Sequence, residues 1–316
     1  FFAFELTPCE IIPRRRQKES NGDQPTNKKD TMKRIISNTV ILTSLLLGTT
    51  TLLVADDAKI DIKGSDTLGA KLVPQLKNAY IKAHPAVKID ILAQGSSHAF
   101  SNLDAGTADI GMSSRKVKQQ ELDKFEAKGK ALVEHIAAWD MIAVIVNEMN
   151  PVRKLSLKQI EGIFTGTITN WAEVGGADAP ISVYTRNTSS GTYKSFSKLA
   201  MSKKDYGTNC QKLEGNQPIV TEVAKNTNGI GYVGYAYAKG DDFKTVKVEG
   251  VSAKVSKIAK YPLARKLFYY TVGEPSGDVA KFLEWATSSD TASDIVAEIG
   301  FIPTPVAQKA MGTLTK

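Results

Sequence analysis

The residues of this sequence that could take part in chemistry gather in four short polar segments. Each is rich in Gly, Ser and Thr and falls between an expected strand and an expected helix, at residues 64–69, 95–98, 111–115 and 186–192. At a helix start, Gly and small hydroxyl residues let backbone N–H groups converge on one point, and the helix dipole adds positive potential there. Four such segments predict a site for an oxyanion.

The fourth segment carries the most specific signal. Arg186 precedes the run Ser190-Gly191-Thr192, which places a fixed cation one helical turn from a cap of backbone and hydroxyl donors. Any of the other segments, taken alone, is more often an ordinary helix cap. Four segments of this kind in one chain, without a catalytic set beside them, favour anion binding over catalysis.

The sequence offers little support for an enzyme. It has no nucleophile elbow, Walker loop, zinc-protease motif or Cys-x-x-Cys pair. We expect His84 to be solvated and His135 to be structural, and His98 forms no dyad merely by following a serine. Cys9 and Cys210 have no neighbours at metal-ligand spacing, so we expect no metal site and no cofactor. A secreted phosphatase using the same pocket would need a nucleophile with a base, or two metals.

The composition fits a folded globular protein that does not bind nucleic acid. The chain has 316 residues, of which 42% are hydrophobic and 23% charged, and this excludes a wholly disordered chain. Its net charge is +8, but residues 56–316 hold 33 basic and 28 acidic side chains, a net of +5. That excess is too small to indicate nucleic-acid binding.

Residues 32–55 have the three parts of a secretory signal peptide. A Met-Lys-Arg start at Met32 precedes an uncharged, largely apolar stretch that ends in the small residue Ala55, and we expect cleavage near Ala55. The alternative is an uncleaved membrane anchor, but many Ser and Thr residues interrupt the stretch. Residues 1–31 are expected to be a spurious or disordered extension, with translation starting at Met32. The mature protein is therefore expected to be periplasmic or secreted.

The elements that would position the polar segments alternate along the chain from Lys59. Apolar periodicity predicts strands at 59–63, 87–93, 108–112, 142–146, 181–184, 229–234, 246–248 and 267–271. It predicts helices at 68–84, 97–105, 119–128, 157–164, 193–201, 220–225, 279–288 and 292–299. This order is typical of an α/β fold, in which ligands bind at the carboxyl ends of the strands, where the polar segments fall.

Several further motifs resemble one known family. They are IFTG at 163–166, NW at 170–171, GIGYVGYA at 229–236, YPLAR at 261–265 and GFIP at 300–303. With the four polar segments, they make the sequence similar to the bacterial periplasmic phosphate-binding proteins of the phosphate ABC transporter, the PstS family. The resemblance runs from about Ile60 to Pro303.

The resemblance implies a set of phosphate ligands. It assigns hydroxyl, backbone N–H and guanidinium donors to Thr67, Leu68, Ser96, Ser114, Arg186, Ser190, Gly191 and Thr192.

The sequence departs from the better-known form of the family at two places. Ser114 stands where a carboxylate accepts the proton of the bound phosphate, and Thr188 stands where an acidic partner of the arginine is often found. Asp66 is the only acidic residue in the four segments, and we consider it as the acceptor; the alternative is a helix cap. Arg115 is a further candidate that either approaches the anion or faces solvent.

The resemblance also implies a two-lobed periplasmic-binding-protein fold with two crossing hinge strands, near 138–142 and 260–266. Lobe one would comprise 57–139 with 267–316, and lobe two 143–259. The implied function is a monomeric extracytoplasmic receptor that delivers inorganic phosphate to an ABC permease. The alternatives are a receptor for another oxyanion, such as sulfate, a phosphate ester or a tungstate-like ion, and a surface sensor or adhesin with the same fold.

Overall fold

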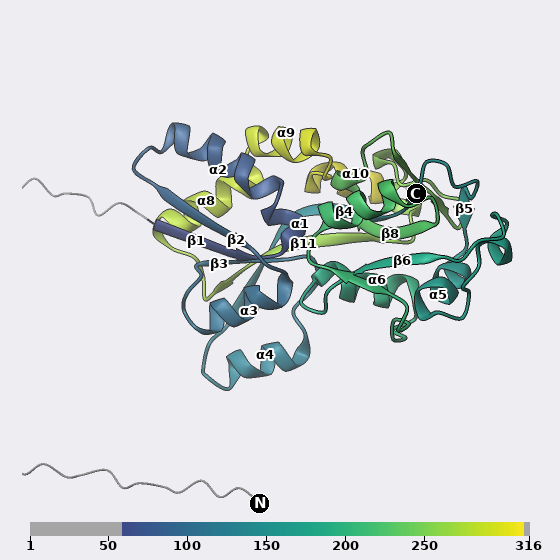
Figure 1. Ribbon diagram of the computed structural model, residues 1–316. Helices are drawn as coiled ribbons and strands as arrows, with labels where there is room; N and C mark the ends of the chain where they lie inside the picture. Colours follow the sequence, from purple (N-terminus) through teal and green to yellow (C-terminus); the bar gives the residue numbers. More distant parts are fainter. Residues whose placement is uncertain (1–58, 313–316) are drawn as a thin grey trace, which may run out of the picture. The chain divides into compact units, whose positions relative to one another are not determined.

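The computed structural model describes residues 59–312, which form a mixed α/β fold (Figure 1). Its strands are β1 (Lys59–Gly64), β2 (Lys88–Ala93), β3 (Ile110–Ser113), β4 (Leu132–Asn147), β5 (Lys154–Leu155), β6 (Ser182–Arg186), β7 (Gln211–Leu213), β8 (Gly229–Gly234), β9 (Phe243–Thr245), β10 (Lys247–Val248) and β11 (Ala264–Val272).

The helices alternate with these strands along most of the chain. They are α1 (Asp66–Gly69), α2 (Leu72–Ala83), α3 (Ser96–Asp104), α4 (Gln119–Glu126), α5 (Leu157–Thr165), α6 (Gly191–Ala200), α7 (Asn216–Lys225), α8 (Gly277–Ser288), α9 (Asp290–Ile299) and α10 (Thr304–Gly312). Short 3-10 helices cover Trp171–Val174, Tyr235–Tyr237 and Val255–Lys260. The leader and extension expected at residues 1–55 lie outside the described residues.

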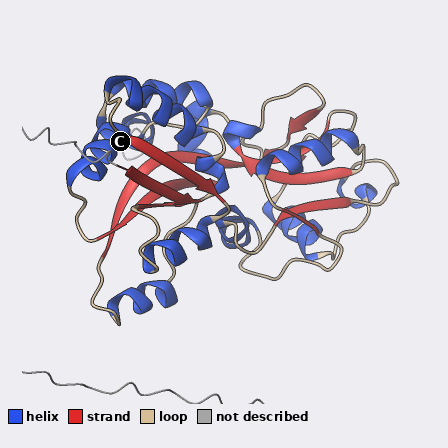
Figure 2. Cartoon of the chain, turned by 60° about the vertical axis from the view of Figure 1, so that its left-hand side comes forward, coloured by secondary structure: helices blue, strands red, loops and turns tan. Residues whose placement is uncertain are grey.

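In the larger sheet the strands follow the order β2-β1-β3-β11-β4-β8-β6-β7, with β9 also paired to β4. The strands β5 and β10 pair in a separate two-stranded sheet. The strands β2, β1 and β3 are parallel, as are β8, β6 and β7, whereas β11 and β4 pair antiparallel with their neighbours. Figures 1 and 2 show two groups of strands, each with helices packed on it, joined by strands that run between them. This is the two-lobed arrangement with two connecting strands that the sequence predicted.

The strand β4 belongs to both groups because it changes partner along its length. Its first part, Leu132 to Met141, pairs with β11, whereas Ile142 to Val146 pair with β8. All residues from Met141 to Val146 are fully buried. A continuous apolar run of this kind is typical of a strand that is covered on both faces.

Two large apolar clusters form the core on either side of this change. One contains Leu68, Leu72, Tyr269 and Phe282, and the other contains Met141, Phe164, Trp171 and Phe196 together with many smaller side chains. The C-terminal segment joins the second cluster, because Ile302 and Ala307 pack there. The burial of these side chains supplies most of the driving force for folding at about 25 cal/mol per Å² of apolar surface.

Local sequence signals explain several of the element boundaries. The helix α5 begins after Ser156, whose hydroxyl accepts from the N–H of Gln159, and ends at Gly166, which has the left-handed backbone conformation that favours glycine. The helix α9 likewise begins after the cap Ser289 and ends at Gly300. These two helices match the sequence prediction closely.

The expected helix at 68–84 was wrong as a single element. The chain forms the short helix α1, turns at Ala70 and Lys71, and continues as α2 from Leu72. The apolar spacing predicts both pieces but not the turn, because Leu68 and Leu72 face the same core. The sequence analysis also missed α10, β9 and the first turn of α7, and the strand predicted at 246–248 corresponds to β10 alone.

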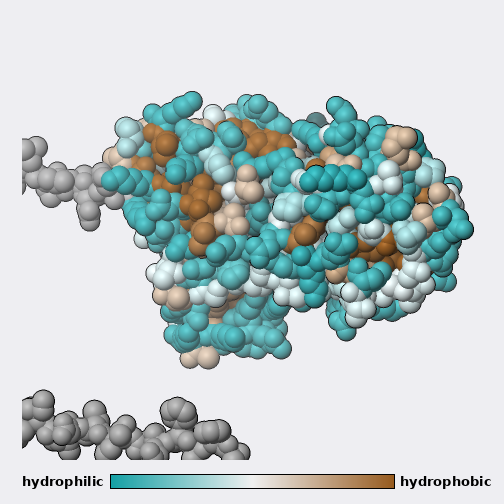
Figure 3. Space-filling view, in the orientation of Figure 1, coloured by the Kyte–Doolittle hydropathy of each residue, from teal (hydrophilic) through white to brown (hydrophobic). Residues whose placement is uncertain are grey.

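The visible surface is largely hydrophilic, with separate apolar patches (Figure 3). Among the described residues, no helix has the length and apolar character needed to cross a membrane.

Candidate functional site: an oxyanion-binding cleft

The first and fourth polar segments meet through two threonines. Thr67, in the first turn of α1, and Thr192, in the first turn of α6, are both buried, and their hydroxyl oxygens lie 2.9 Å apart. Helix α1 follows strand β1 and helix α6 follows strand β6, each after a short turn. The ends of these two strands therefore position the two threonines. Two helix starts, with N–H groups that have no acceptor inside the helix, are therefore brought to one point.

The second and third segments close the same region. The N–H of Ser114 donates to the hydroxyl of Ser96 at 2.9 Å, and the hydroxyls of Ser65 and Ser114 lie 2.5 Å apart. Gly191 lies against this pair so closely that a Cβ atom there would be 2.2 Å from Ser96 Oγ and 3.1 Å from Ser114 Cβ. Only glycine fits at this position, so the sequence around Gly191 permits a contact that a side chain would prevent.

The second and fourth segments are also joined by backbone contacts. The N–H of Ser97 donates to the carbonyl of Ser189 at 3.0 Å, and Ser189 Oγ donates to the carbonyl of Gln94 at 3.2 Å. Gly95 has φ +125°, a conformation that L side chains rarely adopt, and a Cβ there would lie 2.7 Å from Ser189 Oγ. The four segments thus form one closed cluster, as the sequence predicted.

Arg186 is the buried cation of this cluster. It lies at the end of β6 and is 1% exposed, and its Nη2 donates to the carbonyl of Glu214 at 3.3 Å. Its Nε and Nη1 have no hydrogen-bond acceptor among residues 59–312. Burial lowers the pKa of this guanidinium, and the nearby Asp66 opposes the effect. An arginine in this environment remains charged, so its unused donors favour an anion as the ligand.

Asp66 lies beside Arg186. Its Oδ2 is 3.3 Å from Arg186 Nη1, close enough for an ion pair but without the direction of a hydrogen bond. The same oxygen accepts from the N–H of Asn216 at 3.1 Å and from its side-chain amide at 2.7 Å. Ser65, not Asp66, occupies the cap position of α1, and no side-chain cap bond is formed there. Asp66 therefore contacts groups across the cluster and does not cap its own helix.

Asn216 is a member of the cluster that the sequence analysis missed. Besides Asp66, its amide donates to the hydroxyl of Thr67 at 3.3 Å, and its Oδ1 accepts from the N–H of Gly234 at 3.0 Å. It is fully buried at the start of α7. Its only sequence signal is the Gly-Asn pair before an apolar helical run, which is also typical of an ordinary cap.

Asp140 and Arg265 form a second buried pair that the sequence analysis did not assign to the site. Arg265 donates from Nε and Nη2 to Asp140 Oδ2, at 3.0 and 2.7 Å. The other oxygen of Asp140 accepts from the N–H of Tyr235 at 3.0 Å. Burial raises the pKa of Asp140, and Arg265 opposes the effect. Arg265 Nη1 also donates to the carbonyl of Ser114 at 3.2 Å, so this pair links the connecting strands to the third segment.

Arg115 is held away from solvent by another acidic residue. Its two terminal nitrogens donate to the two carboxylate oxygens of Glu121, at 2.7 and 2.6 Å, and its guanidinium lies 4.9 Å from the ring centroid of Phe100. It is 7% exposed, so the alternative that Arg115 faces solvent was wrong. A bidentate pair fixes Arg115 as part of the packing around α4.

The remaining candidates lie in the same cluster. Ser190 is the cap of α6, and its hydroxyl accepts from the N–H of Tyr193 at 3.2 Å. Leu68 is buried in the first turn of α1, where a backbone N–H is the only polar group that it can offer. No group of three or more His, Cys, Asp or Glu residues in the described part of the chain is arranged to hold a metal ion.

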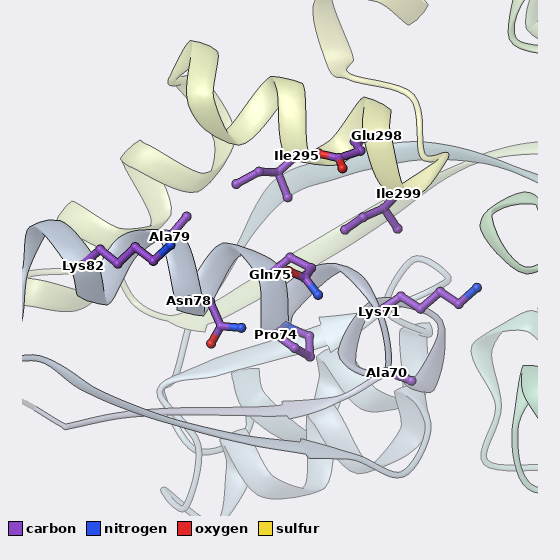
Figure 4. A pocket seen from close by; sticks show the side chains of 10 residues that line it. All are labelled: Ala70, Lys71, Pro74, Gln75, Asn78, Ala79, Lys82, Ile295, Glu298 and Ile299. Carbon is purple, nitrogen blue, oxygen red and sulfur yellow. The ribbon is translucent and has the colours of Figure 1, made fainter.

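A groove elsewhere lacks the chemistry of an oxyanion site. It has a volume of about 550 Å³ and is lined by residues of α2 and α9, among them Gln75, Asn78, Ile295 and Glu298 (Figure 4). Glu298 contributes a carboxylate, and Lys71 donates to the carbonyl of Ala236 at 3.1 Å. The four-segment cluster is therefore the stronger candidate.

The two-lobed fold, with helix starts and hydroxyls converging between the connecting strands, is that of a solute-binding protein. Residues 47–290 match the model of a family described as PBP superfamily domain, and the chain belongs to this superfamily.

Within it, the chain belongs to the PstS family of phosphate-binding proteins. It is 35% identical over 278 residues to phosphate-binding protein PstS of Pseudomonas aeruginosa PAO1, covering 79% of this chain and 85% of that one. It is 31% identical over 259 residues to phosphate-binding protein PstS of Bacillus subtilis 168, covering 79% and 84%. Proteins of this type are extracytoplasmic binding proteins.

Solved structures agree with this assignment. A phosphate ABC transporter substrate-binding protein of Clostridium perfringens, solved with bound phosphate, superposes with a TM-score of 0.72 at 34% identity, covering 78% of this chain and all but 1% of the other. An ABC-type phosphate transport receptor from Vibrio cholerae gives a TM-score of 0.64 at 30% identity, with 77% and 99% coverage.

Proposed function

We propose that this protein is an extracytoplasmic receptor that binds inorganic phosphate and delivers it to an ABC permease. The observation that carries the proposal is the buried Arg186, which lies where the four polar segments meet. Its Nε and Nη1 have no hydrogen-bond acceptor within residues 59–312. The names of the relatives and the bound phosphate in the Clostridium perfringens structure support phosphate as the anion.

The proposed phosphate ligands share one feature, which is a hydrogen-bond donor in one of the four polar segments. They are Thr67, Leu68, Ser96, Ser114, Arg186, Ser190, Gly191 and Thr192. Hydrogen bonds to charged groups contribute about 1.5–3 kcal/mol each, and association and ordering subtract several kcal/mol. The balance allows a dissociation constant of about 1 μM or tighter, which needs about 8 kcal/mol.

Asp66 is the proposed acceptor for the proton that phosphate keeps near neutral pH. Its Oδ2 is occupied by Asn216 and lies near Arg186, which leaves Oδ1 as the oxygen that can accept. The position of Asp66 also compensates for Thr188, because it gives Arg186 the acidic neighbour that the sequence lacks two residues downstream. An ionised carboxylate accepts hydrogen bonds but cannot donate them, so it disfavours sulfate, which carries no proton.

Binding is proposed to close two lobes, 57–139 with 267–316 and 143–259, on the anion. The change of partner along β4 at Met141 and Ile142 supports a boundary there. The contacts between Ser97 and Ser189, and between Thr67 and Thr192, are those of a closed arrangement across this boundary. The division assigns α10 to lobe one. However, Ile302 and Ala307 pack in the second apolar cluster.

The partners and location follow from the same proposal. The protein would act as a monomer after removal of its leader near Ala55, in the periplasm or outside the cell. Its cargo would be phosphate and its protein partner the permease, without nucleic acid and without a catalysed reaction. The similarity to phosphate transport receptors of Clostridium perfringens and Vibrio cholerae supports the permease as partner.

Calorimetric titration of the phosphate-free protein with phosphate, and separately with sulfate, tests this function. We expect one saturable site for phosphate, weaker binding of sulfate, and a higher melting temperature with phosphate, because a ligand that binds only the folded state stabilises it. Tighter binding of sulfate would assign the site to another oxyanion, an alternative that the hydroxyl of Ser114 keeps open. No saturable heat and no thermal shift with either anion would refute the proposal.

A further inference from the structure

A basic groove lies beside the phosphate cluster. We use this name for the hollow of about 430 Å³ between the loop at 115–118, helix α6 from Lys194 to Leu199, and the start of β11 from Ala264 to Phe268. The helices α4 and α6 that flank it lie on the same side of the strands in Figure 1. Seven of its twelve lining residues are Lys or Arg, and none of the described lining residues is acidic.

Three of these cations are neutralised by neighbours outside the lining. Arg115 pairs with Glu121 at 2.6 Å, Arg265 pairs with Asp140 at 2.7 Å, and Lys116 lies 3.5 Å from Glu134. In the described part of the chain, no other carboxylate lies within 4 Å of a cation of the groove.

The other four cations are lysines without such a partner. Among residues 59–312, no carboxylate lies within 4 Å of the amino groups of Lys118, Lys194, Lys198 or Lys266. Lys194 and Lys266 lie over the rings of Tyr193 and Trp139, at 5.0 and 5.2 Å from the ring centroids. Like charges gathered in one hollow repel each other, and an anion placed among them removes that cost.

The floor of the groove strengthens these charges. Phe268 is buried, and Val117 and Leu199 are half-buried, so apolar groups underlie the amino groups. A less polar surrounding makes charge interactions stronger than they are in water. Burial lowers the pKa of Lys118, and Arg115 acts in the same direction while Glu121 opposes it. An anion bound beside this amino group would favour its charged form.

The groove and the phosphate cluster are joined at Ser114. The amide and hydroxyl of Ser114 face Ser96 and Ser65 in the cluster, whereas its carbonyl accepts from Arg265 Nη1 and from Ser195 Oγ on the groove side. Helix α6 likewise begins in the cluster and lines the groove with its middle turns. The cluster and the groove are therefore separate but adjacent, and the groove takes residues from both sides of the proposed closure.

We propose that the basic groove is a second anion site that takes a linear oligophosphate. A volume of about 430 Å³ is in the range of small-molecule sites. Separate point charges on four flexible lysines suit a ligand with negative charge distributed along a chain better than they suit one compact tetrahedral ion. This site goes beyond the phosphate site and does not depend on it for its ligands.

Titration of the full chain with tripolyphosphate, in the presence of saturating orthophosphate, tests the proposal. Orthophosphate fills the cluster, so any tripolyphosphate bound under these conditions occupies another site. We expect one saturable site, and we expect the triple variant Lys118→Gln, Lys194→Gln, Lys198→Gln to weaken binding by at least about tenfold. The same triple variant should bind orthophosphate within about threefold of the original protein.

A matched control removes the same charge elsewhere. The exposed residues Lys82, Lys158 and Lys225, all replaced by Gln, should leave tripolyphosphate affinity within about twofold of the original. An equal loss in both triple variants would show unspecific attraction to a basic protein and would overturn the proposal. Displacement of tripolyphosphate by excess orthophosphate would do the same, because it would place both ligands in one site.

A second titration, with an organic triphosphate, identifies the part of the ligand that the groove recognises. Adenosine triphosphate carries the same phosphate chain, and we expect it to bind the groove with similar affinity and the same dependence on the three lysines. Binding of adenosine triphosphate without binding of tripolyphosphate would overturn the assignment to the phosphate chain. If orthophosphate itself fails to bind, the tripolyphosphate titration of the two triple variants still tests the groove, so the two proposals fail separately.

Discussion

The carboxylate of Asp66 lies 3.3 Å from the guanidinium of Arg186, although the two residues come from different polar segments that are 120 positions apart in the sequence. Asn216 holds the carboxylate in place with two hydrogen bonds. The acidic partner of the arginine is therefore supplied from the opposite side of the cluster, and the two sides are complementary in charge when they meet.

The variant Asp66→Asn should lose the preference for phosphate over sulfate while remaining folded. It replaces a group that only accepts hydrogen bonds with one that also donates, and it makes the site more positive by one charge. Competition between the two anions, measured at constant pH with circular dichroism as the check on folding, tests this. If the preference is unchanged and only thermal stability falls, Asp66 is structural and selectivity comes from Ser114 or from backbone geometry.

Arg186→Ala should weaken phosphate binding by at least about a hundredfold, because it removes two or more charge-assisted hydrogen bonds of about 1.5–3 kcal/mol each. Arg186→Lys keeps the charge but loses the fork of donors, and it should recover only part of the affinity. Isothermal titration measures both variants.

Arg115→Ala provides the contrast to the variants of Arg186. It should change phosphate affinity by less than about threefold and lower stability by up to about 3 kcal/mol, since it breaks the pair with Glu121 in a largely buried place. Urea unfolding measures the stability. Equal losses of affinity for Arg115→Ala and Arg186→Ala would show that the primary cation has been assigned wrongly.

Gly191→Ala should abolish tight phosphate binding without unfolding the protein. Its Cβ would lie 2.2 Å from Ser96 Oγ, so the start of α6 could not approach the second and third segments. Gly312→Ala is the matched control, because a Cβ there meets nothing within 4 Å. The phosphate affinities of the two variants are compared, with melting temperatures as the check on folding. Normal binding by Gly191→Ala would mean that the cluster binds its anion without this close contact.

Cys210 should resist alkylation in the native protein. Burial raises its pKa to about 11, and its thiol donates to the carbonyl of Phe164 at 3.4 Å. Only the thiolate reacts, so at pH 8 the native rate should be about a hundredfold below the rate in denaturant, or lower still because access is blocked. Peptide mass spectrometry after iodoacetamide treatment follows Cys210 separately from Cys9. Comparable native and denatured rates would contradict the burial of this residue.

The sequence predicted most elements and the meeting of the four polar segments, because both depend on local signals. Apolar periodicity determines which face of an element is buried, and carboxyl ends of parallel strands lie at one edge of a sheet. The division between α1 and α2 was not predictable in this way, since Leu68 and Leu72 keep helical spacing across the turn.

The hydrogen-bond and ion-pair partners of individual polar groups were harder to predict from the sequence. Asn216 and the pair of Asp140 with Arg265 act through contacts between distant segments, and only the folded chain brings these together. The pairing of Arg115 with Glu121 spans six positions and was also missed, because no regular helix joins the two residues.

The continuity of β4 has a consequence for how the lobes move. Its neighbours change between Met141 and Ile142, where the N–H of Ile142 donates to the carbonyl of Leu263 and the carbonyl of Ile142 accepts from the hydroxyl of Tyr261. In the proposed opening of the lobes, we expect backbone torsions of these few residues to absorb the movement. In the open form, the amide proton of Ile142 should therefore exchange with solvent deuterium faster than the amides on either side of it. Ligand should slow that exchange. This single amide would then report lobe closure.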